Sequence, residues 1–409
     1  MPIGRENRES GCVDSDTSAR EVPPVALGAD TRSHTGPHSR AAGRPGLDLD
    51  RRPILVFWES TRACLLACAH CRAEAQRDPV GGELTTAEAE RFIDSLAAFG
   101  TPAPVFVITG GDVLMRADLD RLVARARANG LHVALAPSVT PLLTDERMAR
   151  LRDLGVKVAS LSIDGSTAGT HDAMRGIPDH LEASVAAIRR LRSHGYTVQI
   201  NTTVTPANVR ELPAIADLLV RNGASIWEVF FLVNVGRGTS MEELDPDQHE
   251  DVCHFLVDAS HYGFVVRTVE GPMFRRIVRW REEGVEGPRG ELYEHLSSEL
   301  VDRLGAPTSP SRAQARGTRD GRGIVFVSST GDITPAGFLP IVLGNVRTDD
   351  LADVYRNDPT FKRLRAADFS GPCGRCDHRE VCGGSRSRAY AATGDPFASD
   401  PACAYAASI

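Results

Sequence analysis

Short apolar runs alternate with amphipathic runs of helical length from Ile54 onward, and this alternation is the feature that most limits the possible folds. Six runs have the composition of β-strands: 54–59, 105–109, 132–136, 158–163, 197–204 and 226–232. Five helical patterns lie between them, at about 85–98, 117–129, 144–154, 178–194 and 208–222. Strands separated by helices of this length usually form a parallel sheet. Because these units are too few for a closed eight-unit barrel, we expect an α/β fold, an open, TIM-like partial barrel of the (β/α)6 kind.

Residues outside this alternation are expected to form three further segments. Residues 1–50 are rich in Gly, Arg, Asp, Ser and Pro without apolar periodicity, which predicts a disordered leader before the barrel at 51–270. Residues 271–323 are expected to form a charged connector or a cover over the substrate. Residues 324–409 begin with a predicted β-hairpin and form a small cysteine-rich extension.

The sequence leaves two interpretations open for the connector, residues 271–323. Its Gly-, Pro- and Arg-rich composition is typical of a solvated loop. Arginine also binds carboxylates through paired N–H donors, so the same residues are candidates for a clamp on a carboxylate-bearing substrate. The four arginines concerned are Arg312, Arg316, Arg319 and Arg322.

Composition narrows the class of protein. The chain has 409 residues, of which 42% are hydrophobic, so it can bury a core of more than one domain. The net charge of −7 argues against a nucleic-acid-binding protein. No stretch approaches the roughly 18 apolar residues of a membrane helix, and no signal-peptide core is present, so we expect a cytoplasmic location and no membrane partner. Nine cysteines in such a chain indicate metal binding or catalysis rather than disulfides.

Cys64, Cys68 and Cys71 form a CxxxCxxC triplet directly after the first apolar run. Three thiolates suit three irons of a [4Fe–4S] cluster, which leaves the fourth iron open to another ligand. Zinc is the alternative, but a structural zinc site needs four ligands. His70 is an awkward fourth ligand because it adjoins Cys71.

Three motifs in order resemble those of the radical S-adenosylmethionine (radical SAM) enzymes. They are the cysteine triplet, Thr109-Gly-Gly-Asp112 and Ser160-Leu-Ser-Ile-Asp-Gly165. The resemblance implies that S-adenosylmethionine chelates the open iron and is cleaved to methionine and a 5′-deoxyadenosyl radical. It also implies a partial barrel, and an electron donor such as flavodoxin or ferredoxin.

The resemblance also suggests contacts to S-adenosylmethionine around the cysteine triplet. His70 stands where the family usually has an aromatic residue packed on the adenine; the alternative is an exposed loop histidine. Gly110 and Gly111 would let the backbone approach the ligand closely. Asp112 replaces the usual glutamate that contacts the methionyl amine, and Val113 stands where proline is common.

Further cofactor contacts are expected at the ends of the fourth and fifth strands. Ser162 and Asp164 offer a hydroxyl and a carboxylate suited to the ribose hydroxyls. Alternatively, Ser162 is a buried strand residue and Asp164 caps the following turn. Asn201 is a further cofactor contact by resemblance, and it shares one face of its strand with Thr203.

The C-terminal region holds a second group of cysteines: Cys373, Cys376, Cys382 and Cys403. Four thiolates bind either zinc or another [4Fe–4S] cluster. Behind a radical SAM barrel, the arrangement resembles the auxiliary-cluster extension called SPASM. The fuller SPASM pattern has seven cysteines and two auxiliary clusters, but Pro335–Pro340 contains none. The resemblance therefore implies a single auxiliary [4Fe–4S] cluster.

The tail adds a resemblance of its own. Cys382-Gly-Gly-Ser-Arg-Ser-Arg-Ala-Tyr390, with Thr393-Gly-Asp395 and Asp400-Pro-Ala-Cys403, is similar to the branch that processes side chains of haem and modified haems. The function expected is a radical SAM oxidoreductase whose auxiliary cluster takes up an electron, acting on a carboxylate side chain of a tetrapyrrole. The alternatives are a maturase of a ribosomally made peptide, and a non-enzymatic zinc or iron–sulfur binding protein.

Overall fold

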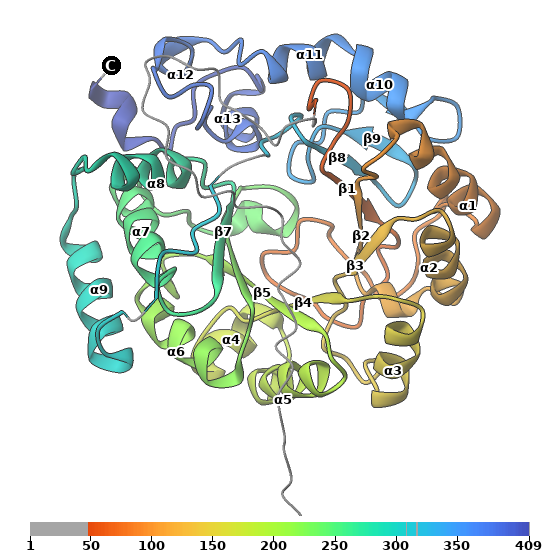
Figure 1. The fold of residues 1–409 in the computed structure, drawn as a ribbon, viewed down its shortest axis with the longest axis horizontal. Helices are drawn as coiled ribbons and strands as arrows, with labels where there is room; N and C mark the ends of the chain where they lie inside the picture. Colours follow the sequence, from red (N-terminus) through yellow and green to blue (C-terminus); the bar gives the residue numbers. More distant parts are fainter. Residues whose placement is uncertain (1–47, 308, 316–317, 409) are drawn as a thin grey trace, which may run out of the picture. The chain divides into compact units, whose positions relative to one another are not determined.

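A single mixed sheet organises the chain. The computed structural model describes residues 48–307, 309–315 and 318–408, so the predicted leader lies outside the described residues except for its last three positions. Ten strands follow the order β10-β9-β8-β1-β2-β3-β4-β5-β6-β7 (Figure 1). They are β1 (Leu55–Glu59), β2 (Val105–Thr109), β3 (His132–Leu135), β4 (Val158–Ser162), β5 (Thr197–Val204), β6 (Ile226–Phe231), β7 (Val265–Val269), β8 (Ile324–Val327), β9 (Asp332–Thr334) and β10 (Gly344–Asn345).

Strands β1 to β7 pair in parallel and in sequence order, as βα units require. The sheet does not close, so the expected open partial barrel is confirmed. The helices are α1 (Thr86–Ser95), α2 (Leu119–Ala128), α3 (Asp145–Asp153), α4 (Ala168–Arg175), α5 (His180–Ser193), α6 (Leu212–Asn222), α7 (Pro246–Ala259), α8 (Met273–Glu283), α9 (Glu291–Leu304), α10 (Leu351–Asn357), α11 (Pro359–Arg365), α12 (Gly371–Arg375) and α13 (Arg386–Thr393). No helix within the described ranges is long and apolar enough to cross a membrane.

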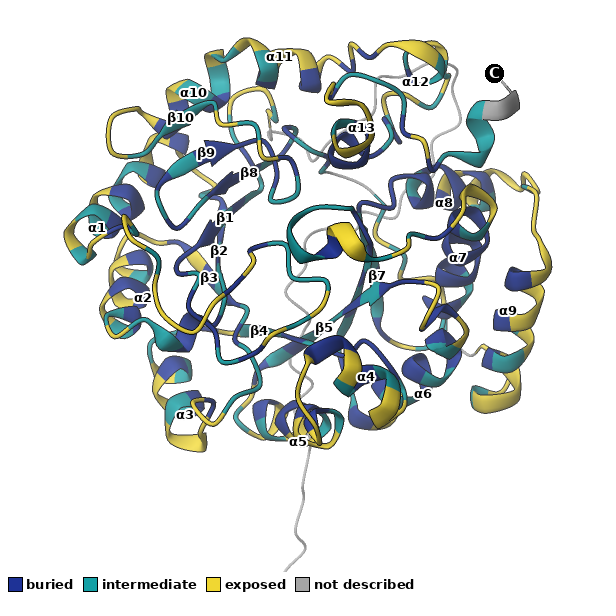
Figure 2. Cartoon of the chain, turned by 180° about the vertical axis from the view of Figure 1, so that it is seen from behind, coloured by how far each residue is buried: buried dark blue, intermediate teal, exposed yellow. Residues whose placement is uncertain are grey.

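Side chains alternate between two environments along each barrel strand. In β5, Val198 and Ile200 are fully buried under the helices, whereas Gln199 and Asn201 are half-buried on the other face. Successive side chains of a strand point to opposite faces, so one face is packed against the helices and the concave face is partly exposed. Figure 2 shows dark blue and teal residues along the strands, whereas yellow exposed residues lie mainly on the outer helices and loops.

Aromatic side chains fill the layer between the sheet and the helices. Trp58 of β1 stacks on Phe106 of β2 with ring centroids 6.1 Å apart, and Phe92 of α1 packs edge-on against both. Burying a large aromatic side chain contributes roughly 2–3 kcal/mol of hydrophobic stabilisation. This cluster fixes the end of β1, from which the first cysteine loop departs.

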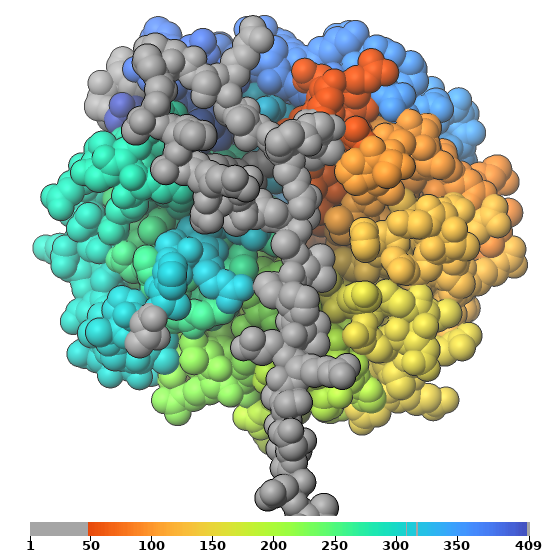
Figure 3. Space-filling view, in the orientation of Figure 1, coloured from red at the N-terminus to blue at the C-terminus, as the bar shows by residue number. Residues whose placement is uncertain are grey.

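The C-terminal hairpin is part of the barrel sheet, which the sequence did not indicate. β8 and β9 pair antiparallel as predicted, but β8 also pairs in parallel with β1, from Leu55 opposite Ile324 to Trp58 opposite Val327. The residues just before β1 lie beside α10 and α11 (Figure 3). There the Tyr355 hydroxyl donates to the carbonyl of Leu49 at 2.7 Å.

The described part of the predicted connector contains two helices, α8 and α9, that the composition concealed. α9 packs on α6 and α7, and its residues Leu292, Leu296 and Leu300 are buried. The expectation of an irregular loop over residues 291–304 was therefore wrong. The charged, mainly acidic outer face of α9 hid an apolar stripe at helical spacing. Farther along, Ala313 forms a bridge to Val266 at the edge of β7.

Candidate active site and auxiliary cysteine site

The cysteine loop is held against the end of β2 by backbone contacts. The amides of Gly111 and Asp112 donate to the carbonyls of Thr61 and Ala63, each at 2.7 Å. A Cβ atom on Gly110 or Gly111 would overlap with these same loop carbonyls. The two glycines are therefore needed for the loop to pack on the strand end, and their close approach to the ligand stays a prediction.

Each sulfur of the triplet has a neighbouring polar hydrogen. The amide of Leu66 donates to Cys64 Sγ and that of Ala75 to Cys71 Sγ, both at 3.4 Å. The Arg175 guanidinium donates to Cys68 Sγ at 3.6 Å. Donors of this kind stabilise thiolates and tune iron–sulfur clusters. The three cysteines thus fit the cluster that their spacing predicts.

A second arginine holds the loop in shape from the β6–α7 connection. Arg237 Nε donates to the Cys68 carbonyl and Nη1 to the Ala75 carbonyl, both at 2.8 Å, and its own amide donates to the Cys71 carbonyl. A Cβ on the preceding Gly236 would overlap with the Arg72 carbonyl. No local motif marks Arg237, so sequence reasoning missed it.

His70 and Asp164 meet in the interior. The His70 side chain is 14% exposed, so it is not the exposed loop histidine that we had kept as an alternative. Its Nε2 lies 3.7 Å from Asp164 Oδ2, which also contacts Arg175 Nη2 at 2.5 Å. Thr203 N donates to Asp164 Oδ1 at 2.7 Å. Burial lowers the pKa of His70 to about 4, so its ring is neutral.

These contacts change the expectation for Asp164. Its side chain is fully buried, and Oδ1 accepts from Thr203 N, whereas Oδ2 contacts Arg175 as an ion pair without a hydrogen-bond partner among the described residues. Burial opposes ionisation, but the charge of Arg175 and the hydrogen bond from Thr203 keep the pKa of the carboxyl below its usual value. Asp164 thus orients Arg175 beside Cys68. Within the described part of the chain, its oxygens accept no hydrogen bond from the following turn, and a contact between Oδ2 and a ribose hydroxyl stays a prediction.

Two buried histidines fix the loop after β4. The Asp164 amide donates to His171 Nδ1 at 3.0 Å, so the His171 proton is on Nε2. That Nε2 lies 2.9 Å from His180 Nδ1, and His180 Nε2 lies 3.0 Å from the Val139 carbonyl. One consistent choice of tautomers satisfies all of these hydrogen bonds with both histidine rings neutral. Burial lowers the pKa of His171 to about 4.

Asp112 is fully buried and has three protein donors. Its Oδ1 accepts from Leu114 N at 3.1 Å and from Ser138 N at 3.3 Å, and its Oδ2 accepts from Thr140 Oγ1 at 2.9 Å. A carboxylate accepts about four hydrogen bonds. Asp112 therefore ties the β2 and β3 loops together with most of its capacity, and burial raises its pKa.

This arrangement predicts different effects for three replacements of Asp112. Asp112→Ala leaves buried donors unpaired and is expected to lower the free energy of unfolding by roughly 1–3 kcal/mol. Asp112→Glu is expected to destabilise as well, because an extra methylene must enter a packed site. Asp112→Asn keeps the size and one acceptor, so it should lose least. Urea unfolding with equilibrium binding of S-adenosylmethionine tests this: a stable Glu variant with unchanged affinity would contradict the capping role.

A polar row crosses the open concave face. Ser162, Asn201, Glu228 and Arg267 lie opposite one another on β4, β5, β6 and β7. Gln199 Nε2 donates to Asn201 Oδ1 at 2.9 Å and to Glu228 Oε2 at 2.8 Å. Burial raises the pKa of Glu228. The structure thus brings Ser162 and Asn201 together on the accessible face and adds Glu228 and Arg267, which we had not singled out.

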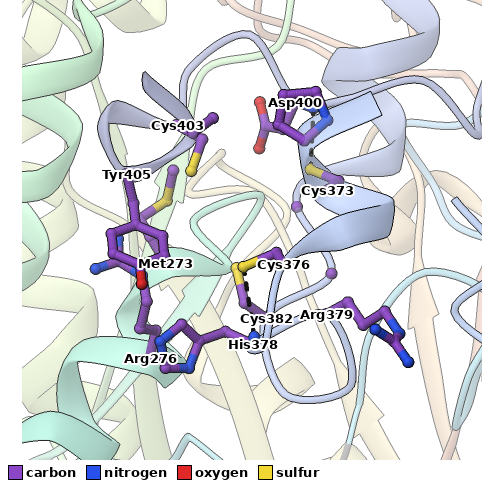
Figure 4. A pocket seen from close by; sticks show the side chains of 14 residues that line it. Met273, Arg276, Cys373, Cys376, His378, Arg379, Cys382, Asp400, Cys403 and Tyr405 are labelled. Atoms are coloured by element: carbon purple, nitrogen blue, oxygen red, sulfur yellow. Dashed lines mark hydrogen bonds between the residues drawn. The ribbon is translucent and has the colours of Figure 1, made fainter. Parts of the chain in front are cut away.

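The four C-terminal cysteines surround one cavity, which Arg276, His378 and Tyr405 also line (Figure 4). Cys373 Sγ accepts from the Asp400 amide and Cys376 Sγ from the His378 amide, both at 3.4 Å. Among the described residues, no three His, Cys, Asp or Glu side chains gather closely enough for a single metal ion. A cavity lined by four sulfurs with N–H donors suits the predicted auxiliary cluster.

The Ser-Arg-Ser-Arg segment of the tail joins this extension to the barrel. Ser385 and Ser387 hydroxyls donate to the Glu270 carboxyl at the end of β7. Burial and the neighbouring Asp320 raise the pKa of Glu270 to about 8. Arg386 donates to Cys373 Sγ at 3.7 Å. The motif that distinguishes the tail is therefore a structural junction between the two cysteine regions.

Of the four connector arginines that could clamp a carboxylate, the structure excludes Arg319, whereas Arg322 is half-buried. Arg319 is 6% exposed, and its Nη atoms donate to four backbone carbonyls, those of Leu364, Arg365, Arg379 and Glu380. Arg312 donates to the Gly263 carbonyl at the surface. Arg316 lies outside the described residues. The guanidinium of Arg319 supports the extension and is unavailable to a substrate.

Comparisons with known proteins agree with this architecture. The radical SAM superfamily profile matches residues 58–219, and the iron-sulfur cluster-binding domain called SPASM matches residues 319–377. The AdoMet-dependent heme synthase of Nitratidesulfovibrio vulgaris is 37% identical over 385 residues, which are 93% of this chain and 98% of that protein. The chain belongs to the radical SAM superfamily.

Two further known proteins are similar to this radical SAM enzyme. The mycofactocin maturase of Mycobacterium ulcerans is 32% identical over 371 residues, which cover 88% of this chain and 89% of that protein. SuiB of Streptococcus suis, solved with S-adenosylmethionine, has the same fold, with a TM-score of 0.63 at 16% identity over 87% of this chain and 78% of SuiB.

Membership of the radical SAM superfamily identifies the class of cofactor. This radical SAM enzyme uses a [4Fe–4S] cluster with S-adenosylmethionine, and its SPASM domain carries auxiliary iron–sulfur chemistry. The expectation of an iron–sulfur oxidoreductase is confirmed, and the alternative of a non-enzymatic zinc or iron–sulfur protein is rejected.

Proposed function

We propose that this radical SAM enzyme oxidatively decarboxylates carboxylate side chains of a tetrapyrrole. The observation that carries the proposal is the likeness to AdoMet-dependent heme synthase, which extends over nearly the full length of both chains. A likeness of this extent covers the barrel and the extension together. The likeness to the mycofactocin maturase is lower, at 32% identity, and makes maturation of a peptide the second candidate.

The residues of this chain would divide the work as follows. Cys64, Cys68 and Cys71 would hold the first cluster, and the four C-terminal cysteines the second. When bound, the first cluster with S-adenosylmethionine supplies a hydrogen-abstracting 5′-deoxyadenosyl radical, and the second supplies an electron acceptor. Ser162 and Asn201, on the accessible concave face, would contact S-adenosylmethionine and fix its position. His70 would pack beside the cofactor as a neutral ring.

The backbone around the site would contribute to the same task. Gly110, Gly111 and Asp112 position the cysteine loop through their backbone contacts. The cap formed by Asp112 keeps that loop in register with the strand ends. We propose that its remaining acceptor capacity meets the ammonium group of S-adenosylmethionine.

Atoms and electrons balance in the proposed reaction when both cofactor sites take part. A propionate-type side chain loses a hydrogen atom from the carbon nearest the ring, which becomes the new hydrogen of 5′-deoxyadenosine. It also loses one electron to the acceptor, and the carboxylate leaves as carbon dioxide. A vinyl group remains. An electron donor such as flavodoxin or ferredoxin would return the electron needed for the next cycle.

Isotope transfer tests the substrate class. With a tetrapyrrole deuterated on its carboxylate side chains, anaerobic enzyme and reductant are expected to give deuterated 5′-deoxyadenosine and carbon dioxide. Short peptides encoded beside the gene, carrying deuterium, serve as the competing substrates. Transfer from a peptide alone would contradict the tetrapyrrole assignment and favour the maturase. Absence of transfer from either would reject both substrates.

A further inference from the structure

Three aromatic side chains from separate segments lie close together beside the first cysteine loop. Phe230 is on β6 and Phe326 on β8, and Phe338 is in the turn after β9. The rings of Phe230 and Phe338 have centroids 6.2 Å apart and are inclined at 58°. Residues more than one hundred positions apart in the sequence thus build one apolar surface.

An arginine from the cysteine loop completes this surface. Arg72 follows Cys71 directly, and its guanidinium carbon lies 4.7 Å from the centroid of Phe326 and 6.0 Å from that of Phe338. Its Nη2 donates to Glu59 Oε2 at 2.6 Å. A guanidinium has five N–H donors, so this single bond leaves donors for an additional acceptor.

The surface is accessible and closely fitted. Phe230, Phe338 and Arg72 are half-buried, whereas the helix-facing neighbour Phe231 is 1% exposed. A Cβ on Gly337 would lie only 3.3 Å from the Phe326 ring, so the Phe338 turn sits tightly against β8. Aromatic rings left half-exposed beside a cation suit a flat, conjugated, anionic ligand.

We propose that Phe230, Phe338 and Arg72 form the surface on which the substrate rests, with the tetrapyrrole plane stacked on Phe338, the tilted ring of Phe230 against its edge and one carboxylate at Arg72. This inference rests on the proposed function and adds the residues that select the substrate. Because Arg72 adjoins Cys71, a side chain held at Arg72 is near the first cysteine site. Phe338 belongs to the Pro335–Pro340 segment, in which the fuller SPASM pattern has a cysteine and this chain has none.

Equilibrium binding of two iron porphyrins tests the proposal. Iron coproporphyrin III carries carboxylate side chains, and iron octaethylporphyrin carries none. Phe338→Ala is expected to raise the Kd for both about tenfold. Phe338→Leu, which keeps the packing of the turn, should lose most of the same affinity. Arg72→Gln is expected to raise the Kd for iron coproporphyrin III at least tenfold, with little change for iron octaethylporphyrin.

A matched control lies in the extension, where Phe397 also packs on an arginine, with the Arg363 guanidinium carbon 3.7 Å from the ring centroid. Phe397→Ala is expected to bind both porphyrins as wild type does. Iron content and urea unfolding of each variant identify any general loss of structure. Unchanged affinity in Phe338→Leu and Arg72→Gln, while the wild type binds porphyrin and transfers deuterium from it, would overturn this surface alone. A wild type that binds neither porphyrin would overturn the proposed function.

Discussion

Replacing Cys64, Cys68 and Cys71 together by alanine is expected to abolish the release of 5′-deoxyadenosine from S-adenosylmethionine. The three sulfurs come from one loop and each accepts a hydrogen bond, so their removal leaves no ligand in that loop. Two four-iron clusters correspond to about eight irons per chain. Iron analysis of the anaerobic variant should therefore give about four, all at the C-terminal cysteines.

Cys253 provides the matched control. It is fully buried on α7, where it acts as a small apolar residue. Cys253→Ala should retain about eight irons and full cleavage of S-adenosylmethionine, apart from a modest loss of stability. A triple variant that still released 5′-deoxyadenosine would contradict the assignment of the first site. Zinc near one per chain with little iron in the wild type would contradict both sites.

Arg388→Met is expected to destabilise the protein by about 3–5 kcal/mol, because removing one member of a buried charge group leaves the others unpaired. Arg388 is 2% exposed. Its Nε donates to Glu243 Oε2 at 2.7 Å, and its Nη2 donates to the carbonyls of Leu232 and Glu270, each at 3.1 Å. Asp400 lies 3.5 Å from Nη1. These contacts join α13 to the ends of β6 and β7.

Urea unfolding followed by circular dichroism measures this effect, with Arg279→Met as the control. Arg279 pairs with Glu283 on the exposed face of α8, where such pairs contribute less than about 1 kcal/mol. The destabilisation by Arg388→Lys should lie between those of Arg388→Met and Arg279→Met, since lysine keeps the charge but cannot form the forked contacts of a guanidinium. Equal unfolding midpoints for Arg388→Met and Arg279→Met would contradict the role of Arg388 as a junction.

Much of the barrel could be predicted from the sequence because strand and helix periodicities are local. Each expected strand from the first to the sixth lies within a residue or so of an observed one. α9 was missed because its charged outer face dominated the composition. The pairing of β8 with β1 was missed because it joins residues about 270 positions apart, and no local pattern records such a contact.

The glycine pair after β2 shows how a correct motif can have an unexpected cause. The sequence placed Gly110 and Gly111 beside the cysteine triplet, and the structure agrees. The structure adds a steric reason that the motif did not indicate, because the carbonyls of the cysteine loop lie against both glycines. Spacing reports that a position is constrained, whereas only the folded chain identifies the neighbour that imposes the constraint.

The sequence by itself determined the chemistry of this protein, namely which cysteines belong to each group, the order of the βα units and the class of enzyme. These features depend on spacing along the chain, which is covalent and local. Only the tertiary structure decided the partners of buried charges: Arg175 with Asp164, Arg237 with the cysteine loop, and Arg388 with the end of the barrel. A buried charge must find its partner in space, and that partner is set by the fold.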